Sequence, residues 1–327
     1  MMMWVDEFAP KSLAELDFHK PVTEMLERIA SLKDVPHLLF HGPSGAGKCT
    51  RARLLLKALY GDGAALTKKE TVQVDSKLEF NVYGSIYHTE IYCSDLGFKD
   101  RQCVQTLIKG LAGLGSSAGF GSGKPKCRVF MLHEAHTLTL AAQASLRRTM
   151  ERYSSTSRFF LLTERLSSLI APLRSRCICI RVPAPDASMV EMALRKTPAA
   201  KKTVTALAAT ERNMRRAFVR AQLINIRGTN GGKLDWEHSV DQIVLSLRKP
   251  SIEAFLNCRN QLQEAYAHGI DGQLLLETLA DRLILEVAEN NRPLLAKAAA
   301  FYSQTMAQGS KEVFHLEGFI AHCLCLK

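Results

Sequence analysis

In the first half of the chain, short apolar runs alternate with segments of helical periodicity. The apolar runs predict buried strands at 37–40, 128–132, 158–163 and 177–182. Helical periodicity predicts one helix over about 48–60, ended by Gly61, and a second over 141–153. Strands that alternate with helices are typical of a parallel sheet covered by helices on both faces, so the predicted fold class is α/β.

Two segments depart from this alternation. The β-rich stretches 71–74 and 86–92 predict a hairpin-like insertion. Gly and Ser are frequent over 110–124, which predicts a mobile loop.

The pattern becomes helical after Val182-Pro183-Ala184-Pro185, which we interpret as a hinge, and a Gly-rich linker follows at 227–232. We therefore predict an α/β domain over 1–183, a small helical domain over 184–232 and an all-helical domain over 233–327. Apolar residues at helical spacing in the last domain favour core or partner-helix contacts over ligand sites. They include Leu275, Leu279 and Leu283, and the last helix is expected to bury Val313, Phe314, Phe319, Ile320 and Leu324.

Charge and cysteine content narrow the class of protein. Forty-three Lys and Arg against 32 Asp and Glu give a net charge of +11, which favours a polyanion such as nucleic acid, although basic charge also serves solubility alone. The nine cysteines form no C-x-x-C pair, so they indicate neither a zinc site nor a disulfide framework. No apolar run is long enough for a membrane span, and the N-terminal stretch carries an acidic pair where a secretory signal would be basic. We expect a soluble intracellular protein with no membrane partner.

The strongest chemical signal is a phosphate-binding loop between a predicted strand and a predicted helix. Residues 42–48 fit G-x-x-x-x-G-K, in which glycines let backbone N–H groups point at phosphate oxygens. The helix N-terminus adds partial positive charge, and Lys48 is expected to reach the β- and γ-phosphates. The predicted phosphate-binding residues are Gly42, Pro43, Ser44, Gly45, Ala46, Gly47, Lys48, Cys49 and Thr50.

The same loop departs from a working P-loop at the positions that bind Mg²⁺. Cys49 stands where Ser or Thr would offer a hydroxyl, and a thiol is a poor ligand for that cation. Thr50 is expected to point elsewhere on the helix. On the second strand, Glu134 keeps the water-polarising acid of a Walker B pair, but His133 replaces the metal-binding Asp. We predict slow turnover or none, and no metal site; a zinc site in His133-Glu134-Ala135-His136 is disfavoured because it lacks the i, i+4 helical spacing of zincins.

Taken in order, five motifs resemble the small subunits of replication factor C, especially the type called subunit three, in the clamp-loader branch of the AAA+ proteins. They are W-V-D-E-F-A-P at 4–10, P-H-L-L-F-H-G-P-S-G-A-G-K at 36–48, A-S-L-R-R-T-M-E at 144–151, R-S-R-C at 174–177, and the segment at 309–317 that begins G-S-K and ends F-H-L-E. The resemblance runs over nearly the whole chain.

This resemblance implies an AAA+ P-loop domain, a helical lid and a helical collar that closes a five-subunit ring. Arg176 is implied to be an arginine finger that reaches the ATP site of a neighbouring subunit, and Arg215 to be the sensor arginine of the lid. The remaining implied nucleotide contacts are Val5, Phe8, Pro10 and Met214. The expected ligand is ATP or ADP, with Mg²⁺ weak or absent.

The implied partners are the other replication factor C subunits, a ring-shaped sliding clamp and primer–template DNA. DNA contacts are expected to be salt-sensitive and sequence-independent, with Lys99 and Arg101 as weak candidates. A nuclear location and a role in replication and repair follow from the resemblance.

Two further positions differ from the family pattern. Ala9 replaces an arginine near the nucleotide, and Glu164 falls where a sensor asparagine is usual, so that its carboxylate would repel the γ-phosphate. Three alternatives stay open: an autonomous P-loop ATPase or kinase, a scaffold that never binds nucleotide, and a subunit of another clamp loader that shares the small subunits.

Overall fold

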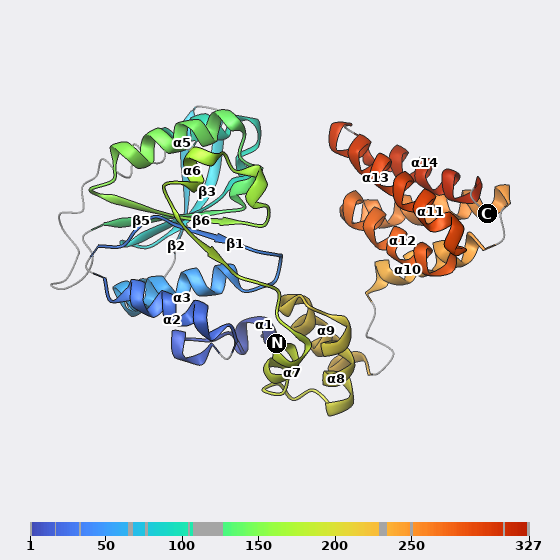
Figure 1. The fold of residues 1–327 in the computed structure, drawn as a ribbon, viewed down its shortest axis with the longest axis horizontal. Coiled ribbons are helices and arrows are strands. Elements are labelled where there is room, and N and C mark those ends of the chain that lie inside the picture. Colours follow the sequence, from blue (N-terminus) through green and yellow to red (C-terminus); the bar gives the residue numbers. More distant parts are fainter. Residues whose placement is uncertain are drawn as a thin grey trace. The chain divides into compact units, whose positions relative to one another are not determined.

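The computed structural model describes residues 2–16, 18–32, 34–64, 68–75, 78–103, 105–106, 127–228, 234–248, 251–309 and 311–325. The chain divides into two compact units, Met1–Thr229 and Asn230–Lys327. The first unit contains a sheet with its covering helices and a group of small helices, and the second is entirely helical (Figure 1). The predicted separation of residues 1–183 from residues 184–232 stays a prediction.

A seven-stranded sheet of order β2-β3-β4-β5-β6-β1-β7 forms the centre of the first unit. Its strands are β1 (Leu38–His41), β2 (Lys68–Asp75), β3 (Leu78–Gly84), β4 (His88–Tyr92), β5 (Arg128–His133), β6 (Ser157–Thr163) and β7 (Ile178–Arg181). Strands β4, β5, β6, β1 and β7 are parallel, whereas β2 and β3 add an antiparallel edge. The four predicted strands correspond to β1, β5, β6 and β7, and the parallel sheet that contains them confirms the predicted α/β class.

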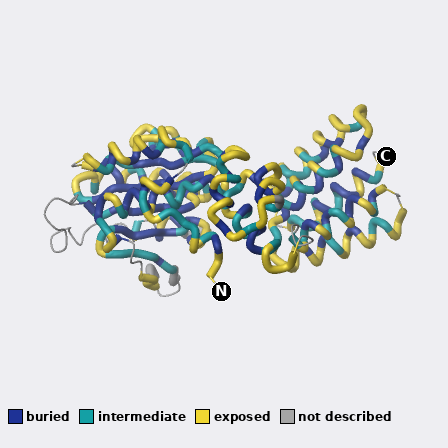
Figure 2. The backbone as a smooth tube through the Cα atoms, turned by 90° about the horizontal axis from the view of Figure 1, so that it is seen from below, coloured by how far each residue is buried: buried dark blue, intermediate teal, exposed yellow. Residues whose placement is uncertain are grey.

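Two helical layers cover the sheet. Figure 1 shows α5 (Leu140–Arg152) and α6 (Ala171–Arg174) on one face, and α2 (Lys20–Ala30) and α3 (Lys48–Tyr60) on the other. Since side chains alternate along a strand, neighbouring residues enter opposite cores: Leu39 packs toward α5, while Phe40 packs toward α3. Figure 2 shows the central strands buried along their length, as expected for a sheet covered on both sides.

A small helical group completes the first unit. Helices α7 (Ala187–Leu194), α8 (Lys201–Thr210) and α9 (Met214–Arg227) pack with the N-terminal helix α1 (Trp4–Glu7). Trp4 is buried among them, and its backbone N–H donates to Gln222 Oε1 at 3.0 Å. This contact joins the first residues of the chain to α9, more than 200 residues away in sequence.

The second unit consists of α10 (Asp235–Ser246), α11 (Ile252–Ala267), α12 (Gly272–Glu286), α13 (Arg292–Gln308) and α14 (Glu312–Cys325). Leu275, Leu279 and Leu283 lie in its core, as their spacing predicted, together with Phe319 and Ile320. The prediction for Phe314 was wrong, because this residue is 59% exposed.

Short 3₁₀ helices connect these elements: η1 (Leu13–Glu15), η2 (Asp62–Ala64), η3 (Cys93–Lys99), η4 (Ala135–Thr137), η5 (Leu166–Ser168) and η7 (Glu289–Asn291).

The predicted insertion is paired differently from our expectation. The stretch 71–74 lies in β2 and forms a hairpin with β3, a strand that we did not predict. The stretch 86–92 contributes β4, which pairs with β5 in the parallel part of the sheet. The alternating sequence Leu78-Glu79-Phe80-Asn81-Val82-Tyr83 was the available signal for β3. The predicted mobile loop at 110–124 lies outside the described residues.

Among the described helices, none combines the length and apolar character that a bilayer crossing requires.

Candidate nucleotide site

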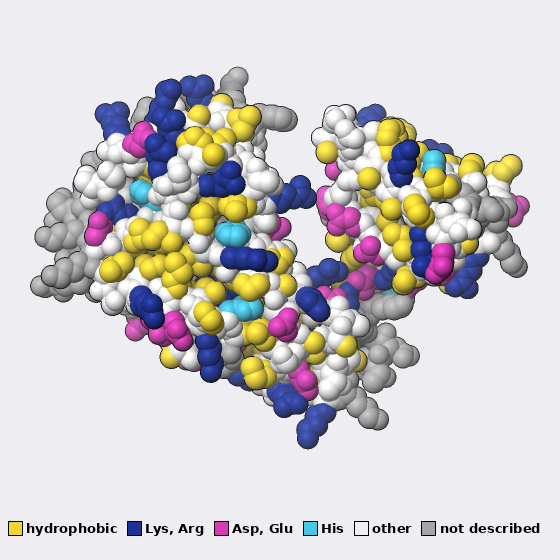
Figure 3. Space-filling model, in the orientation of Figure 1, with side chains coloured by type: hydrophobic (Ala, Val, Ile, Leu, Met, Phe, Trp, Pro, Cys, Tyr) yellow, Lys and Arg dark blue, Asp and Glu magenta, His cyan; other side chains and the backbone are white. Residues whose placement is uncertain are grey.

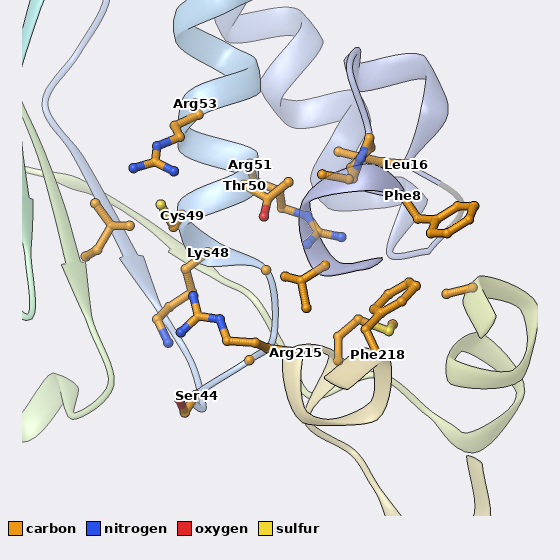
Figure 4. Close-up of a pocket in the computed structure, with 18 of the residues that line it drawn as sticks. Phe8, Leu16, Ser44, Lys48, Cys49, Thr50, Arg51, Arg53, Arg215 and Phe218 are labelled. Carbon is orange, nitrogen blue, oxygen red and sulfur yellow. The ribbon is translucent and has the colours of Figure 1, made fainter. Parts of the chain in front are cut away.

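A cavity of about 730 Å³ opens between the P-loop, the N-terminal segment and α9 (Figure 4). It gathers most of the site residues predicted from sequence, although they come from distant parts of the chain. Those that line it are Val5, Phe8, Pro10, Ser44, Gly45, Gly47, Lys48, Cys49, Thr50, Glu134, Met214 and Arg215. Ala9, His133 and Glu164, the positions that depart from the family pattern, also line it.

The P-loop is held by direct contact with β7 and α9. A Cβ on Gly42 would lie 1.9 Å from the carbonyl oxygen of Val182, and one on Gly45 would lie 1.8 Å from Asn213 Oδ1. Asn213 also caps α9, where its Oδ1 accepts the N–H of Arg216 at 3.2 Å, and the N–H of Met214 donates to the Gly45 carbonyl at 3.2 Å. The loop therefore has glycine where the neighbouring backbone and cap leave no room for a side chain.

Lys48 is the first residue of α3 and carries the charge at the phosphate end of the cavity. Its Nζ donates to the carbonyls of Gly42 and Pro43, each at 2.8 Å, and lies 3.7 Å from Glu164 Oε1. Burial lowers the pKa of Lys48, while Glu164 acts in the opposite direction and Arg215 lowers the pKa further. Figure 4 shows the Arg215 side chain extending toward Lys48. Together these two residues form a cationic end wall suited to phosphate.

Arg51 stabilises the P-loop by hydrogen bonds to neighbouring carbonyls, a role that our sequence analysis did not predict. Its side chain is fully buried, and it donates to the carbonyls of Ala46 at 3.2 Å and Phe18 at 3.0 Å. The guanidinium also lies over the Phe18 ring, 4.9 Å from its centroid. Burial lowers the pKa of Arg51 to about 10. Arg51 thus joins the P-loop to the segment that precedes α2.

A buried carboxylate, Glu90 on β4, organises the side of the cavity where a Walker B pair would lie. Arg53 donates to it through Nε at 3.1 Å and Nη2 at 2.7 Å, and His133 Nε2 lies 3.0 Å from Oε2. His88 Nε2 approaches at 3.5 Å, and the Tyr92 ring stacks on His133 with centroids 4.4 Å apart. Arg53 and Glu90 had no motif to mark them in the sequence.

The pKa values of this cluster are shifted in opposite directions. Burial alone raises the pKa of Glu90, but hydrogen bonds from His133, His88 and Arg53 outweigh it and hold that pKa far below its usual range. Burial alone lowers the pKa of His133, but contacts with Cys49 and Glu90 outweigh it and raise that pKa to about 9. At neutral pH, His133 is therefore an imidazolium paired with a carboxylate.

The donors around this cluster do not fit Mg²⁺. The fold family holds that ion with a hydroxyl and an acidic side chain, but here Cys49 supplies a thiol and His133 a positive charge. Thr50 does not restore the hydroxyl, since Figure 4 shows Cys49 and Thr50 pointing to different sides of α3, as expected. Within the described part of the chain, no group of three or more His, Cys, Asp or Glu side chains is arranged to hold a metal ion.

The raised pKa of His133 predicts a pH dependence of stability. Because the pKa is about 9 in the folded chain and 6.5 in the unfolded chain, the stabilisation is complete below pH 6.5 and is lost as the pH rises through 9. We expect the free energy of unfolding to fall by about 3 kcal/mol over this pH window. In the His133→Asn variant this pH-dependent fall should be absent. Urea unfolding at pH 6.5 and 9.5, followed by Trp4 fluorescence in a Trp236→Phe background, measures it; equal pH slopes for both proteins would contradict the assignment.

The other end of the cavity is apolar. Phe8, Leu16, Phe18, Met214 and Phe218 line it, and they come from the N-terminal segment and α9. These side chains offer surface for a flat aromatic ring, while the opposite end offers cations for phosphates. The cavity therefore has the two-part chemistry of a nucleotide site.

Of the remaining predicted residues, Gly42, Pro43, Ala46 and Arg176 are not among the lining residues of the cavity. The carbonyls of Gly42 and Pro43 accept hydrogen bonds from Lys48 Nζ. Ala46, in the same loop, is buried. Glu134 lines the cavity, is exposed and has a left-handed backbone (φ 53°), an uncommon conformation for a non-glycine residue. Arg176 is not among the described lining residues: it follows α6, pairs with Glu151 and donates to the Pro172 carbonyl at 2.6 Å.

The two proposed DNA candidates are only partly described. Arg101 is exposed and lies two residues after η3, whereas the side chain of Lys99 lies outside the described residues.

A P-loop between β1 and α3 on a five-stranded parallel core, closed by a helical group that carries Arg215, defines an AAA+ nucleotide-binding protein. A solved structure of a RuvB mutant from Thermotoga maritima shares this fold, with a TM-score of 0.50 and 15% identity over 81% of this chain and 86% of that one.

Comparisons with known proteins identify the family. Residues 236–327 match the model "Replication factor C subunit 3, C-terminal domain", and residues 18–186 match "DNA polymerase III, delta subunit". The chain is 34% identical to replication factor C subunit 3 of Mus musculus, over 100% of this chain and 96% of the relative. It is 34% identical to subunit 5 of Schizosaccharomyces pombe, with coverages of 98% and 95%, and 32% identical to subunit 5 of Saccharomyces cerevisiae, with coverages of 99% and 99%.

The chain belongs to the replication factor C small subunits, of the type related to subunits 3 and 5. This confirms the resemblance found in its motifs and supports a clamp-loader role.

Proposed function

We propose that this chain is a clamp-loader subunit that binds ATP or ADP without hydrolysing it and assists hydrolysis in a neighbouring subunit. The observation that supports the proposal is that one cavity keeps a phosphate-binding loop but lacks the usual metal-binding side chains. The phosphate cradle is complete at Gly45, Gly47 and Lys48, while Cys49 and His133 occupy the positions where related sites bind the metal. The bound nucleotide then serves to hold the N-terminal segment, the P-loop and α9 together.

Glu164 adds a second reason for slow turnover. Its carboxylate lies 3.7 Å from Lys48 Nζ, at the end of β6 beside the place where a γ-phosphate would be. A carboxylate there repels additional negative charge, whereas an asparagine would donate a hydrogen bond to it. Glu134 is retained as the residual Walker B acid, but it has no metal-binding neighbour to work with.

In the proposed assembly, Arg176 neutralises charge at the neighbour's transferring phosphoryl group. Its position supports this role, because Arg176 does not line its own chain's cavity, its side chain is 35% exposed, and its guanidinium pairs with Glu151. We further propose that the chain acts in the nucleus, in replication and repair, with the other four subunits of the ring and with a ring-shaped sliding clamp. Other clamp loaders that share the small subunits fit the same residues.

Primer–template DNA is the proposed polyanionic partner. The net charge is +11, and Figure 3 shows Lys and Arg side chains gathered along the edge that α5 forms in Figure 1. On this helix Arg148 and Arg152 are exposed and Arg147 is half-buried. Such side chains contact phosphates without reading sequence, so binding should weaken steeply as salt rises.

One pair of measurements on the isolated chain tests the proposal against its rivals. Equilibrium dialysis with labelled ADP and ATP should show binding, and an ATPase assay with Mg²⁺ should show no turnover above background. Brisk hydrolysis by the single chain would instead identify an autonomous ATPase. Absence of binding to either nucleotide would favour the scaffold.

Replacing Lys48 with Ala should weaken nucleotide binding about 30- to 100-fold, because charge-assisted hydrogen bonds to phosphate are lost. Assembly of the complex should suffer with it, while ATPase in complexes that do assemble should change little. Lys57→Ala, which removes a surface lysine from the same helix, is the matched control. Loss of ATPase in a fully assembled Lys48→Ala complex would contradict the prediction.

A further inference from the structure

The phosphate end of the cavity contains protein cations at the place where related proteins use a divalent ion. Arg53 and His133 both line the cavity, and both are held by Glu90, whose side chain is 1% exposed. Arg53 follows Cys49 by four residues, so the two share one face of α3. On the sheet side, β4 and β5 run parallel with Tyr92 opposite His133, which places Glu90 and the imidazole at the same strand ends.

The charge of this cluster is positive. The two side chains that this cluster presents to the cavity, Arg53 and His133, are the basic ones, whereas the carboxylate of Glu90 is buried and does not line the cavity. Arg53 lines the cavity and its side chain is 52% exposed, while two nitrogens of its guanidinium bond to Glu90. A divalent cation would be repelled here, whereas an anion would be attracted.

The cluster is also rigid. Arg53 makes a two-point contact with the carboxylate, His133 is stacked against the Tyr92 ring, and Glu90 has hydrogen-bonding partners on both of its oxygens. Cations held in this way do not have to be ordered when a ligand binds, which favours affinity.

We propose that Arg53 and His133, positioned by Glu90, replace the divalent ion, so that the cavity takes a nucleoside di- or triphosphate without metal. This inference deepens the proposed nucleotide-holding function and rests on it. The two cations supply the charge neutralisation that the metal supplies elsewhere. They do not supply a metal-bound geometry for in-line attack, in agreement with a site that holds nucleotide and does not cleave it.

The direct test compares nucleotide affinity with and without metal. Labelled ADP and ATP are titrated into the purified chain in excess MgCl₂ and in excess EDTA, and the two Kd values should agree within about twofold for each nucleotide. A Kd that is tenfold or more weaker in EDTA would overturn the metal-free site while leaving the proposed function intact. No binding in either buffer would overturn both.

A matched pair of variants on α3 tests the role of the protein cation. Arg53→Met removes the guanidinium that faces Glu90 and should weaken ADP binding in EDTA about tenfold or more. Lys57→Met removes an equal charge from the surface of the same helix, where Lys57 pairs with Asp62, and should bind within twofold of the unaltered chain. Wild-type affinity in a folded Arg53→Met chain, verified by Trp4 fluorescence, would refute the proposal.

Discussion

Replacing Arg176 with Ala should slow ATP hydrolysis by about 10³-fold at the neighbouring site that receives this side chain in the assembled complex. The physical reason is that the guanidinium of an arginine finger neutralises charge on the transferring phosphoryl group. Arg176 lies outside its own chain's cavity, where it pairs with Glu151 and donates to the Pro172 carbonyl. The chain's own affinity for nucleotide should therefore stay unchanged.

The measurement is single-turnover hydrolysis in the reconstituted complex, together with equilibrium dialysis of ADP into the isolated variant. Arg174→Ala, which removes a guanidinium two residues earlier, at the end of α6, is the matched control and should retain most of the activity. Arg176→Lys should recover little, because an ammonium lacks the planar two-point geometry of the guanidinium. An unchanged rate of ATP hydrolysis in the Arg176→Ala complex would show that Arg176 is not an arginine finger.

Replacing Glu90 with Ala should destabilise the first unit by about 3–5 kcal/mol, since it leaves a buried cationic cluster without its carboxylate. Arg53, His88 and His133 all face this residue, and two of the three are nearly fully buried. The loss should be larger at pH 6 than at pH 9.5, because His133 is charged at the lower pH and closer to neutral at the higher one.

Urea unfolding monitored by Trp4 fluorescence measures this change in the Trp236→Phe background. The control is Asp62→Ala, which removes a carboxylate whose side chain is 90% exposed and pairs with Lys57 on α3. A surface pair of this kind should contribute less than about 1 kcal/mol. Equal stabilities of the two variants would show that Glu90 does not organise the cluster.

Features that depend on contiguous residues were predictable from the sequence. The P-loop, the helix that begins at Lys48 and ends at Gly61, and strands β1, β5, β6 and β7 each lie within one short segment. Apolar runs and helical periodicity mark such segments because the backbone geometry of a helix or strand decides which of its neighbouring side chains point to the buried face. The replacement of the usual metal-binding residues by Cys49 and His133 could also be predicted, because each lies within a motif of contiguous residues.

The hairpin was assigned to the wrong partner because strand pairing is not a local property. The segment 71–74 was expected to pair with the stretch 86–92, but in the folded sheet it pairs with β3, while β4 pairs with β5. Register and partner depend on which faces become buried in the assembled sheet.

By itself, the sequence determined that this protein has a phosphate-binding loop with altered metal positions, three successive patterns of elements and the motifs of its family. Only the tertiary structure showed that Arg51 joins the P-loop to Phe18, and that Glu90 holds Arg53 and His133 beside the cavity. The contacts of Arg51 with Phe18, and of Glu90 with Arg53 and His133, join residues 33 to 43 positions apart. Whether a buried charge finds its partner depends on how separate strands and helices meet, and no short segment of the chain contains that information.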